Sequence, residues 1–185
     1  MINEILNEAD QKMDKSVEAT REEFAAIRAG RVSPSMFAKI HADYYGTPTP
    51  LQQLASFTAS EARTILVSPY DMGAMVAIEK AIRDSDLGVN PANDGKVLRC
   101  VFPELTEERR KEYIKVARHK AEEGRVSVRN IRRHAKHDLE ILDKEGEAGQ
   151  DEVASAEKRL ESLTKGHTDK IDEMLKHKEA ELLEV

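Results

Sequence analysis

The residues with the clearest chemical potential are five cations spaced three, four or seven positions apart. They are Arg118, Arg125, Arg129, Arg132 and Lys136. On a helix of 3.6 residues per turn, these spacings place all five within a narrow band along one flank. No acidic residue occurs between Gly124 and His137, and arginine forms bidentate hydrogen bonds with phosphate. The band therefore predicts a helix face that binds a polyanion.

The distribution of charge supports this prediction but leaves a second interpretation open. Residues 106–137 carry eleven basic and five acidic side chains, net +6, within a chain of net charge −6. Residues 138–185 carry seven basic and fifteen acidic side chains, net −8. The cations could therefore lie on a solvated face, or form a seam that pairs with this acidic segment.

Metal binding and catalysis are not indicated. His134 and His137 share a helix face near Asp138, but a third convincing ligand is missing. Residues 84–88 begin like a calcium loop and lack its glycine and its glutamate. No nucleophile lies in a recognisable pairing with a base, and Cys100 sits in a strand-like run typical of a core residue. We therefore predict no metal, no cofactor and no enzymatic activity.

Composition limits the class of protein further. Charged residues make up 35% of the 185 and aromatic residues 4%, which favours long solvated helices over a thick core. A single cysteine excludes an internal disulfide. The sequence shows no leader and no apolar run of about 18 residues, so we expect a cytoplasmic protein without a membrane span.

Three long helices must position the cations. Residues 2–28 repeat apolar side chains every three or four positions, as do residues 106–144 and 150–183. Thr106 is a good N-cap for the second helix, and residues 146–149 break it from the third. The apolar arc of the second helix consists of Tyr113, Ala117, Ala121, Gly124, Val128, Ile131, Ala135, Leu139 and Leu142.

The segment between the first two helices has a different character, because all six prolines lie from Pro34 to Pro103. We predict strands over 37–43, 54–58, 63–68 and 96–102, a loop over 46–50 and a turn over 59–61. Asp71 is placed to cap a helix over 72–84. The segment therefore reads as a small α+β domain.

These elements predict an α+β protein with two domains. Residues 1–29 and 106–185 form an elongated three-helix bundle, because none of the three amphipathic helices is stable alone in water. Residues 30–105 form the domain inserted between the first and second helices. The bundle should be roughly 50–60 Å long at 1.5 Å per residue.

Two connectors, around residues 28–32 and 102–106, must join the domains. Gly30 relaxes the backbone in the first connector and Pro103 restricts it in the second, which is the geometry of a hinge. The alternative is a fixed angle, held by packing of Arg28, Arg31 and Leu105. We predict a hinge.

Five blocks spread along the chain resemble the signature segments of the ribosome recycling factor family, bacterial type. They are IRAGRVSPS at 27–35, YYGTPTPLQQLA at 44–55, SDLGVNP at 85–91, LTEERRK at 105–111 and VRNIRR at 128–133, with KEAEL at 178–182. They occur in the family's order and span nearly the whole chain. Residues 136–141 and 146–149 depart from the family pattern.

The resemblance implies a three-helix bundle with an inserted β/α/β domain, arranged like the letter L. It also implies a non-catalytic factor, without cofactor, that binds the 70S ribosome after termination through large-subunit ribosomal RNA. With elongation factor G it would separate the subunits and release mRNA and tRNA. The family's arginines map onto Arg110, Arg129 and Arg132, and Arg133 adjoins them. We expect a monomer that binds neither DNA nor membrane; the alternative is a coiled-coil scaffold whose inserted domain binds a protein.

Overall fold

The computed structural model describes residues 1–184. Val185, the last residue of the predicted bundle, lies outside the described residues. Three long helices dominate: α1 (Ile2–Ala26), α4 (Glu107–Lys144) and α5 (Gln150–Leu183). The chain divides into two compact units. The first contains Met1–Phe24 and Lys115–Glu179, and the second contains Ala25–Ile114 with the chain from Ala180. The domain limits expected from the sequence stay a prediction.

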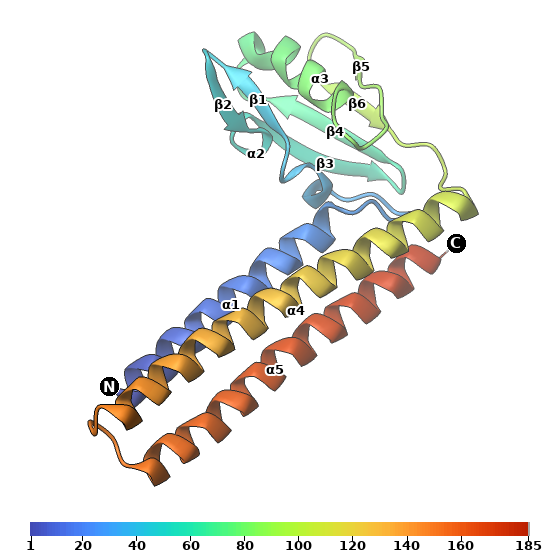
Figure 1. The fold of residues 1–185 in the computed structure, drawn as a ribbon. Coiled ribbons are helices and arrows are strands. Elements are labelled where there is room, and N and C mark those ends of the chain that lie inside the picture. The colour runs from blue at the N-terminus through green and yellow to red at the C-terminus, as the bar shows by residue number, and fades with distance from the viewer. Residues whose placement is uncertain (185) are drawn as a thin grey trace. The chain divides into compact units, whose positions relative to one another are not determined.

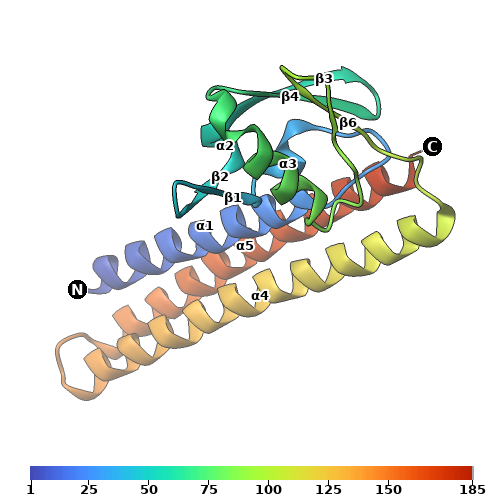
Figure 2. The same cartoon turned by 90° about the horizontal axis from the view of Figure 1, so that it is seen from above.

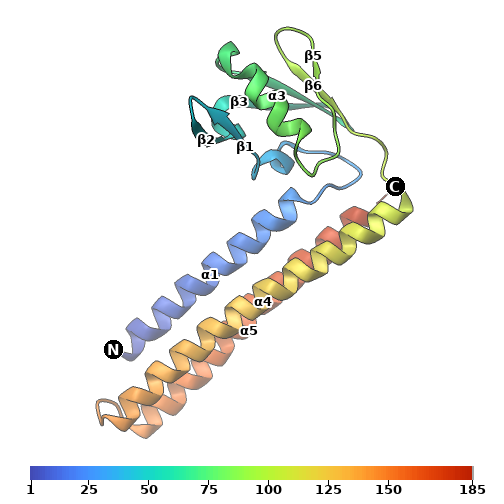
Figure 3. The ribbon, with the colours of Figure 1, turned by 45° about the horizontal axis from the view of Figure 1, so that its top comes forward.

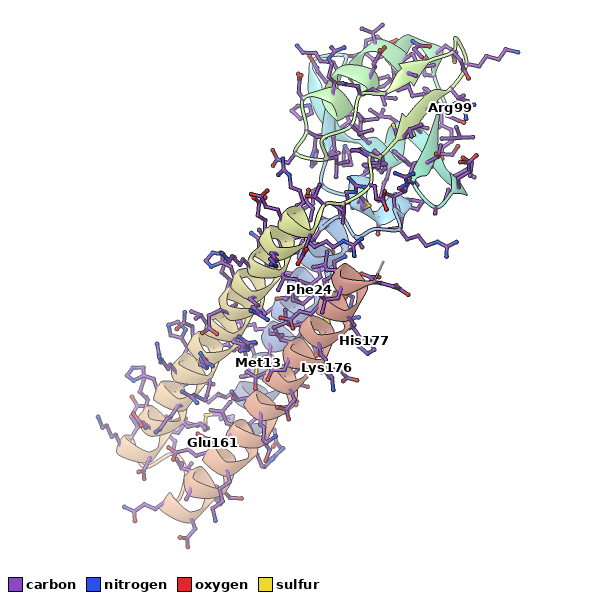
Figure 4. The ribbon with its side chains drawn as sticks, turned by 90° about the vertical axis from the view of Figure 1, so that its right-hand side faces the viewer. Met13, Phe24, Arg99, Glu161, Lys176 and His177 are labelled. Atoms are coloured by element: carbon purple, nitrogen blue, oxygen red, sulfur yellow. The ribbon has the colours of Figure 1, made fainter. Side chains whose placement is uncertain are left out.

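The first unit is a three-helix bundle in which α4 runs antiparallel to α1 and α5 (Figures 1 and 2). Seven of the nine residues of the predicted α4 arc are buried, while Tyr113 and Ile131 are half-buried. The apolar face predicted for α1 is likewise buried from Leu6 to Phe24. Met13 and Phe24 point into the interior, whereas Lys176 and His177 lie on the outer side of α5 (Figure 4).

Three polar or charged residues of α5, Thr164, His167 and Lys178, are buried, although apolar spacing alone did not identify them. Thr164 and His167 are buried, with 6% and 4% of their surface exposed. Leu163, Met174 and Leu175, which continue the apolar spacing of this helix, are only half-buried. The spacing from Leu160 through Thr164 and His167 to Ile171 is four, three and four, so these residues share the core stripe.

The second unit contains an antiparallel sheet of four strands in the order β3-β4-β6-β5, with α3 (Met75–Arg83) against one face (Figure 3). The strands are β3 (Ala55–Glu61), β4 (Thr64–Pro69), β5 (Ala92–Asn93) and β6 (Leu98–Val101). Ile65, Val67, Leu98 and Ile78 are fully buried between sheet and helix. The predicted mixed α+β class is confirmed.

A two-stranded hairpin replaces the loop that we predicted over residues 46–50. β1 (His41–Tyr44) pairs with β2 (Thr47–Pro50) across Tyr45 and Gly46, whose φ angles are 50° and 84°. Two successive positive φ angles match a two-residue hairpin turn, which glycine favours. The prolines of β2 misled the prediction, since proline is tolerated in such an edge strand but not in a central one.

Other boundaries differ from the prediction by a few residues. β3 extends through Glu61, so the turn falls at Ala62 and Arg63 instead of 59–61. Of the strand predicted at 37–43, only residues 41–43 are a strand, within β1, whereas Phe37 ends a 3-10 helix, η1 (Pro34–Phe37). The helix predicted over 72–84 begins as η2 (Met72–Ala74) before α3, and a short helix, α2 (Leu51–Leu54), was not predicted.

The predicted caps are present. The Thr106 Oγ1 atom accepts from the Arg109 amide at 3.1 Å, and Asp71 Oδ1 accepts from the Gly73 amide at 2.9 Å. Tyr44 donates to Asp71 Oδ2 at 2.8 Å. The Gly73 amide and then Tyr44 lower the pKa of Asp71. Just beyond the end of α4, Gly146 is left-handed with φ 69°, and the amides of Gly146 and Glu147 donate to the Asp143 and Leu142 carbonyls.

Candidate nucleic-acid interface

All seven predicted RNA-binding residues lie on α4, but they do not form one uniform surface. Arg118, Arg125, Arg129, Arg132, Arg133 and Lys136 belong to the helical bundle of the first unit. Arg110 belongs to the second unit, where its guanidinium donates to the Glu184 carbonyl at 3.0 Å. Hence six of the candidates can act as one site within the bundle.

The first two cations of the band pair with α5. Arg118 Nε lies 2.7 Å from Glu179 Oε1, and Arg125 Nε lies 2.7 Å from Asp172 Oδ1. The Arg125 side chain is only 19% exposed. For these two residues the structure matches the alternative interpretation, in which the cations pair with the acidic third helix. They therefore have less freedom to contact a ligand.

Glu122 forms ion pairs with the two cations in the middle of the band, Arg125 and Arg129. One of its carboxylate oxygens lies 2.7 Å from Arg125 Nη1, and the other lies 3.2 Å from Arg129 Nη1. Hydrogen bonds from Arg125 and then Arg129 lower the pKa of Glu122. Arg129 remains 41% exposed, so this contact fixes its guanidinium without covering it. Glu122 thus orients one candidate phosphate-binding arginine.

The last three cations make no ion pair within residues 1–184. Arg133 donates to Asn130 Oδ1 at 3.1 Å, whereas Arg132 and Lys136 have neither an ion pair nor a side-chain hydrogen bond in that range. Arg132 is half-buried, and Arg133 and Lys136 are exposed. With the exposed part of Arg129, which also pairs with Glu122, these residues form a patch of net positive charge that we call the free cationic patch. It suits phosphate groups spaced along a nucleic acid.

The sequence analysis identified the cations but not the carboxylates that pair with some of them, which are Glu122, Asp172 and Glu179. Glu122 lies three positions before Arg125 and seven before Arg129, so helical spacing alone could have indicated this contact. The pairing of Arg118 and Arg125 with α5 depends on the relative register of two helices. The spacing of residues within one helix does not indicate how that helix is aligned with its neighbour.

The five predicted hinge residues all lie in the second unit. Arg28 is buried; its Nη2 atom donates to the Pro103 carbonyl, and its Cζ lies 5.3 Å from the Phe102 ring centroid. Leu105 is buried and Arg31 is exposed, while a Cβ on Gly30 would lie 3.6 Å from the Glu184 carbonyl. Arg28 therefore ties the first connector to the second.

Three other features bear on function. Cys100 is fully buried, and burial raises the pKa of its thiol to about 11, so it is a core residue as predicted. No helix within residues 1–184 has both the length and the apolar character required to cross a membrane. His134 and His137 are exposed on α4.

Comparison with known proteins identifies close relatives along the whole chain. The sequence model of the family described as ribosome recycling factor matches residues 20–183. Ribosome-recycling factors of Nocardioides sp. and Acidothermus cellulolyticus are 80% and 63% identical over all 185 residues, covering 100% of each chain.

Two solved structures similar to this chain belong to the same family. One is a solution structure of the ribosome recycling factor, 38% identical, with a TM-score of 0.79 over 100% of this chain and 98% of that one. The other is a T. thermophilus ribosome recycling factor placed with E. coli elongation factor G on the E. coli post-termination complex. It is 42% identical, with a TM-score of 0.70 over 100% of both chains.

Proposed function

Because the chain belongs to the ribosome recycling factor family, we propose that it binds the post-termination ribosome and, with elongation factor G, separates the subunits. mRNA and tRNA are released in the process. The observation that carries this proposal is the match to the family over residues 20–183, together with relatives that align end to end. A solved relative placed with elongation factor G on that complex supports the same partner.

The free cationic patch is the contact that we assign to large-subunit ribosomal RNA. Arginine offers a planar fork of donors to phosphate, and each phosphate contact releases counterions from the RNA. Arg129, Arg132, Arg133 and Lys136 lie within two turns of one rigid helix, so they keep their spacing when they bind. Arg110 would contribute separately from the second unit, and Arg118 and Arg125 mainly join α4 to α5.

The factor acts without catalysis or a cofactor of its own, and the partner GTPase supplies the chemical energy. Its place of action is the cytoplasm, where it works as a monomer. Co-sedimentation with 70S ribosomes over a range of salt concentrations tests the proposal. Binding should weaken steeply with salt, because phosphate contacts dominate it. A protein that stays in the supernatant even at low salt would instead fit the scaffold alternative.

Replacing Glu122 by glutamine should strengthen ribosome binding about twofold to fivefold. The change removes a negative charge that competes with phosphate for Arg129 and Arg125 and keeps the hydrogen-bonding shape. Co-sedimentation at fixed salt measures the effect. Glu18→Gln is the matched control, because Glu18 forms a similar exposed pair with Arg21 on α1. Unchanged or weaker binding by the Glu122 variant would show that its charge does not compete with RNA.

We further propose that the two predicted domains, the helical bundle and the inserted domain of residues 30–105, reorient in solution by tens of degrees about the connectors. Arg28 fastens the connectors to each other through Phe102 and Pro103, so motion would occur on the bundle side of this link. Residual dipolar couplings of the free protein should require a separate alignment tensor for each domain. One tensor that fits both domains would contradict the hinge and favour a fixed angle.

A further inference from the structure

A buried histidine of the bundle lies between two carboxylates of the neighbouring helix. Within residues 1–184, Asp10, Asp14 and His167 are the one group of three or more acidic, histidine or cysteine side chains close enough to share a metal ion. Asp10 and Asp14 lie one turn apart on α1, so they face the same side of that helix. His167 reaches them from the core stripe of α5.

The two ring nitrogens of His167 have different surroundings. Nε2 lies 2.7 Å from Asp10 Oδ1, which is the distance of a charge-assisted hydrogen bond. Nδ1 lies 3.4 Å from Asp14 Oδ1 and has no hydrogen-bond partner within residues 1–184. The side chain is only 5% exposed, so solvent does not readily satisfy this nitrogen. Because a carboxylate accepts, Nε2 donates to Asp10, and in the neutral imidazole this tautomer leaves the Nδ1 lone pair facing Asp14.

Two acceptor atoms that face each other repel unless a cation or a water molecule lies between them, and Nδ1 is the one of the two that is buried. A proton would draw Nδ1 and the carboxylate to about 2.7–2.9 Å, as the Asp10 contact illustrates on the other nitrogen. Two ligands of one tetrahedral zinc ion, each about 2.0–2.1 Å from the metal, lie roughly 3.3 Å apart. The 3.4 Å separation of Nδ1 and Asp14 Oδ1 therefore leaves room for one ion bound to both atoms.

From this geometry, and against the expectation of no metal from the sequence, we propose that the bundle binds a divalent transition-metal ion of the zinc class through His167 Nδ1 and the Asp14 carboxylate. The site offers only two side-chain ligands, and the buried Nδ1, unpartnered within residues 1–184, is what distinguishes it from the exposed His134 and His137. Asp10 acts from the opposite side of the ring, where its carboxylate holds the imidazole in the tautomer that leaves Nδ1 free to ligate. Imidazole with carboxylate selects zinc-like ions over magnesium and calcium, which prefer oxygen alone. Asp14 is 56% exposed, so the ion can enter beside it and complete its coordination with water.

The bound ion would join α1 to α5 and stabilise the folded bundle. An ion that binds only the folded state raises the melting temperature with its concentration. At about a hundredfold excess over its dissociation constant, the increase should be roughly 5–10 °C for a chain of this size. The inference concerns the bundle alone and does not depend on the proposed function.

The test is calorimetric titration of the full-length protein with zinc chloride, together with melting curves followed by circular dichroism. We expect one ion per chain, a higher melting temperature, and visible absorption of tetrahedral type when cobalt replaces zinc. Asp14→Asn should abolish these signals, and it leaves the buried His167 in place. Asp10→Asn should weaken binding about tenfold to a hundredfold, as losses of such supporting carboxylates do.

Surface histidines provide the control. The double variant His134→Asn with His137→Asn removes the exposed pair on α4 and should bind zinc as the parent does. A parent protein whose melting temperature does not change in millimolar zinc would overturn the proposal and leave the cluster as a hydrogen-bonded contact between helices. Equal binding by the parent and Asp14→Asn, or loss of binding in the His134 and His137 variant, would overturn it as well.

Discussion

Replacing Arg129 and Arg132 together by glutamine should weaken ribosome binding about a hundredfold while the bundle stays folded. Each charge-assisted hydrogen bond to phosphate contributes about 1.5 kcal/mol or more, which is about tenfold in affinity. The slope of log affinity against log salt should decrease by roughly one unit or slightly less for each lost contact. Co-sedimentation across a salt series measures both quantities.

Stability should change little, because neither residue belongs to the buried stripe of α4. Arg129 is 41% exposed, and Arg132 has no ion pair within residues 1–184 that its replacement would break. The matched control is Lys170→Gln with Lys176→Gln, which removes the same charge from exposed positions of α5. If the control binds as weakly as the arginine variant, net charge rather than the free cationic patch governs binding.

Gly124→Leu should lower the free energy of unfolding of the bundle by about 3 kcal/mol. A Cβ atom at Gly124 would lie 2.3 Å from Thr20 Oγ1 and 3.1 Å from Ile171 Cδ1, so α1, α4 and α5 leave no room for a side chain. Thr20 Oγ1 is itself held by a 2.9 Å hydrogen bond to the Ser16 carbonyl. Thermal and urea denaturation followed by circular dichroism measure the loss.

Two further sets of variants test whether steric overlap at Gly124 causes this loss of stability. Gly166 lies on α5 with open space where a Cβ atom would stand, so Gly166→Ala should stabilise the protein by up to about 1 kcal/mol through helix propensity. Thr20→Ala removes the hydroxyl in contact and should make Gly124→Ala less destabilising than it is in the parent. A Gly124→Leu variant as stable as the parent would show that the helices can separate there without cost.

Helical periodicity predicted the bundle well, because burial of one face is repeated over many turns. The α4 arc shows this, since most of its predicted members are buried and its cap at Thr106 is present. The hairpin from His41 to Pro50 was missed for a local reason. Its turn uses Tyr45 at a positive φ, where asparagine or glycine is usual, and its prolines suggested a loop.

The candidate site was predictable only in part. Spacing placed the cations on one flank of α4, but which of them remain unpaired depends on the register between α4 and α5. Asp172 and Glu179 lie about fifty residues or more from their arginine partners, so no local pattern relates them. The contacts of His167 could not be predicted for the same reason. A histidine within an apolar stripe indicates only a core position, and its partners Asp10 and Asp14 lie on another helix.

Subunit separation followed by light scattering tests the central proposal most directly. Post-termination 70S complexes are mixed with the protein, elongation factor G and GTP. We predict a fall in scattering that requires both proteins and GTP, and that disappears with the folded Arg129→Gln and Arg132→Gln variant. Scattering that stays constant with the parent protein, or falls equally with the variant, would contradict the proposal that this chain recycles ribosomes through the free cationic patch.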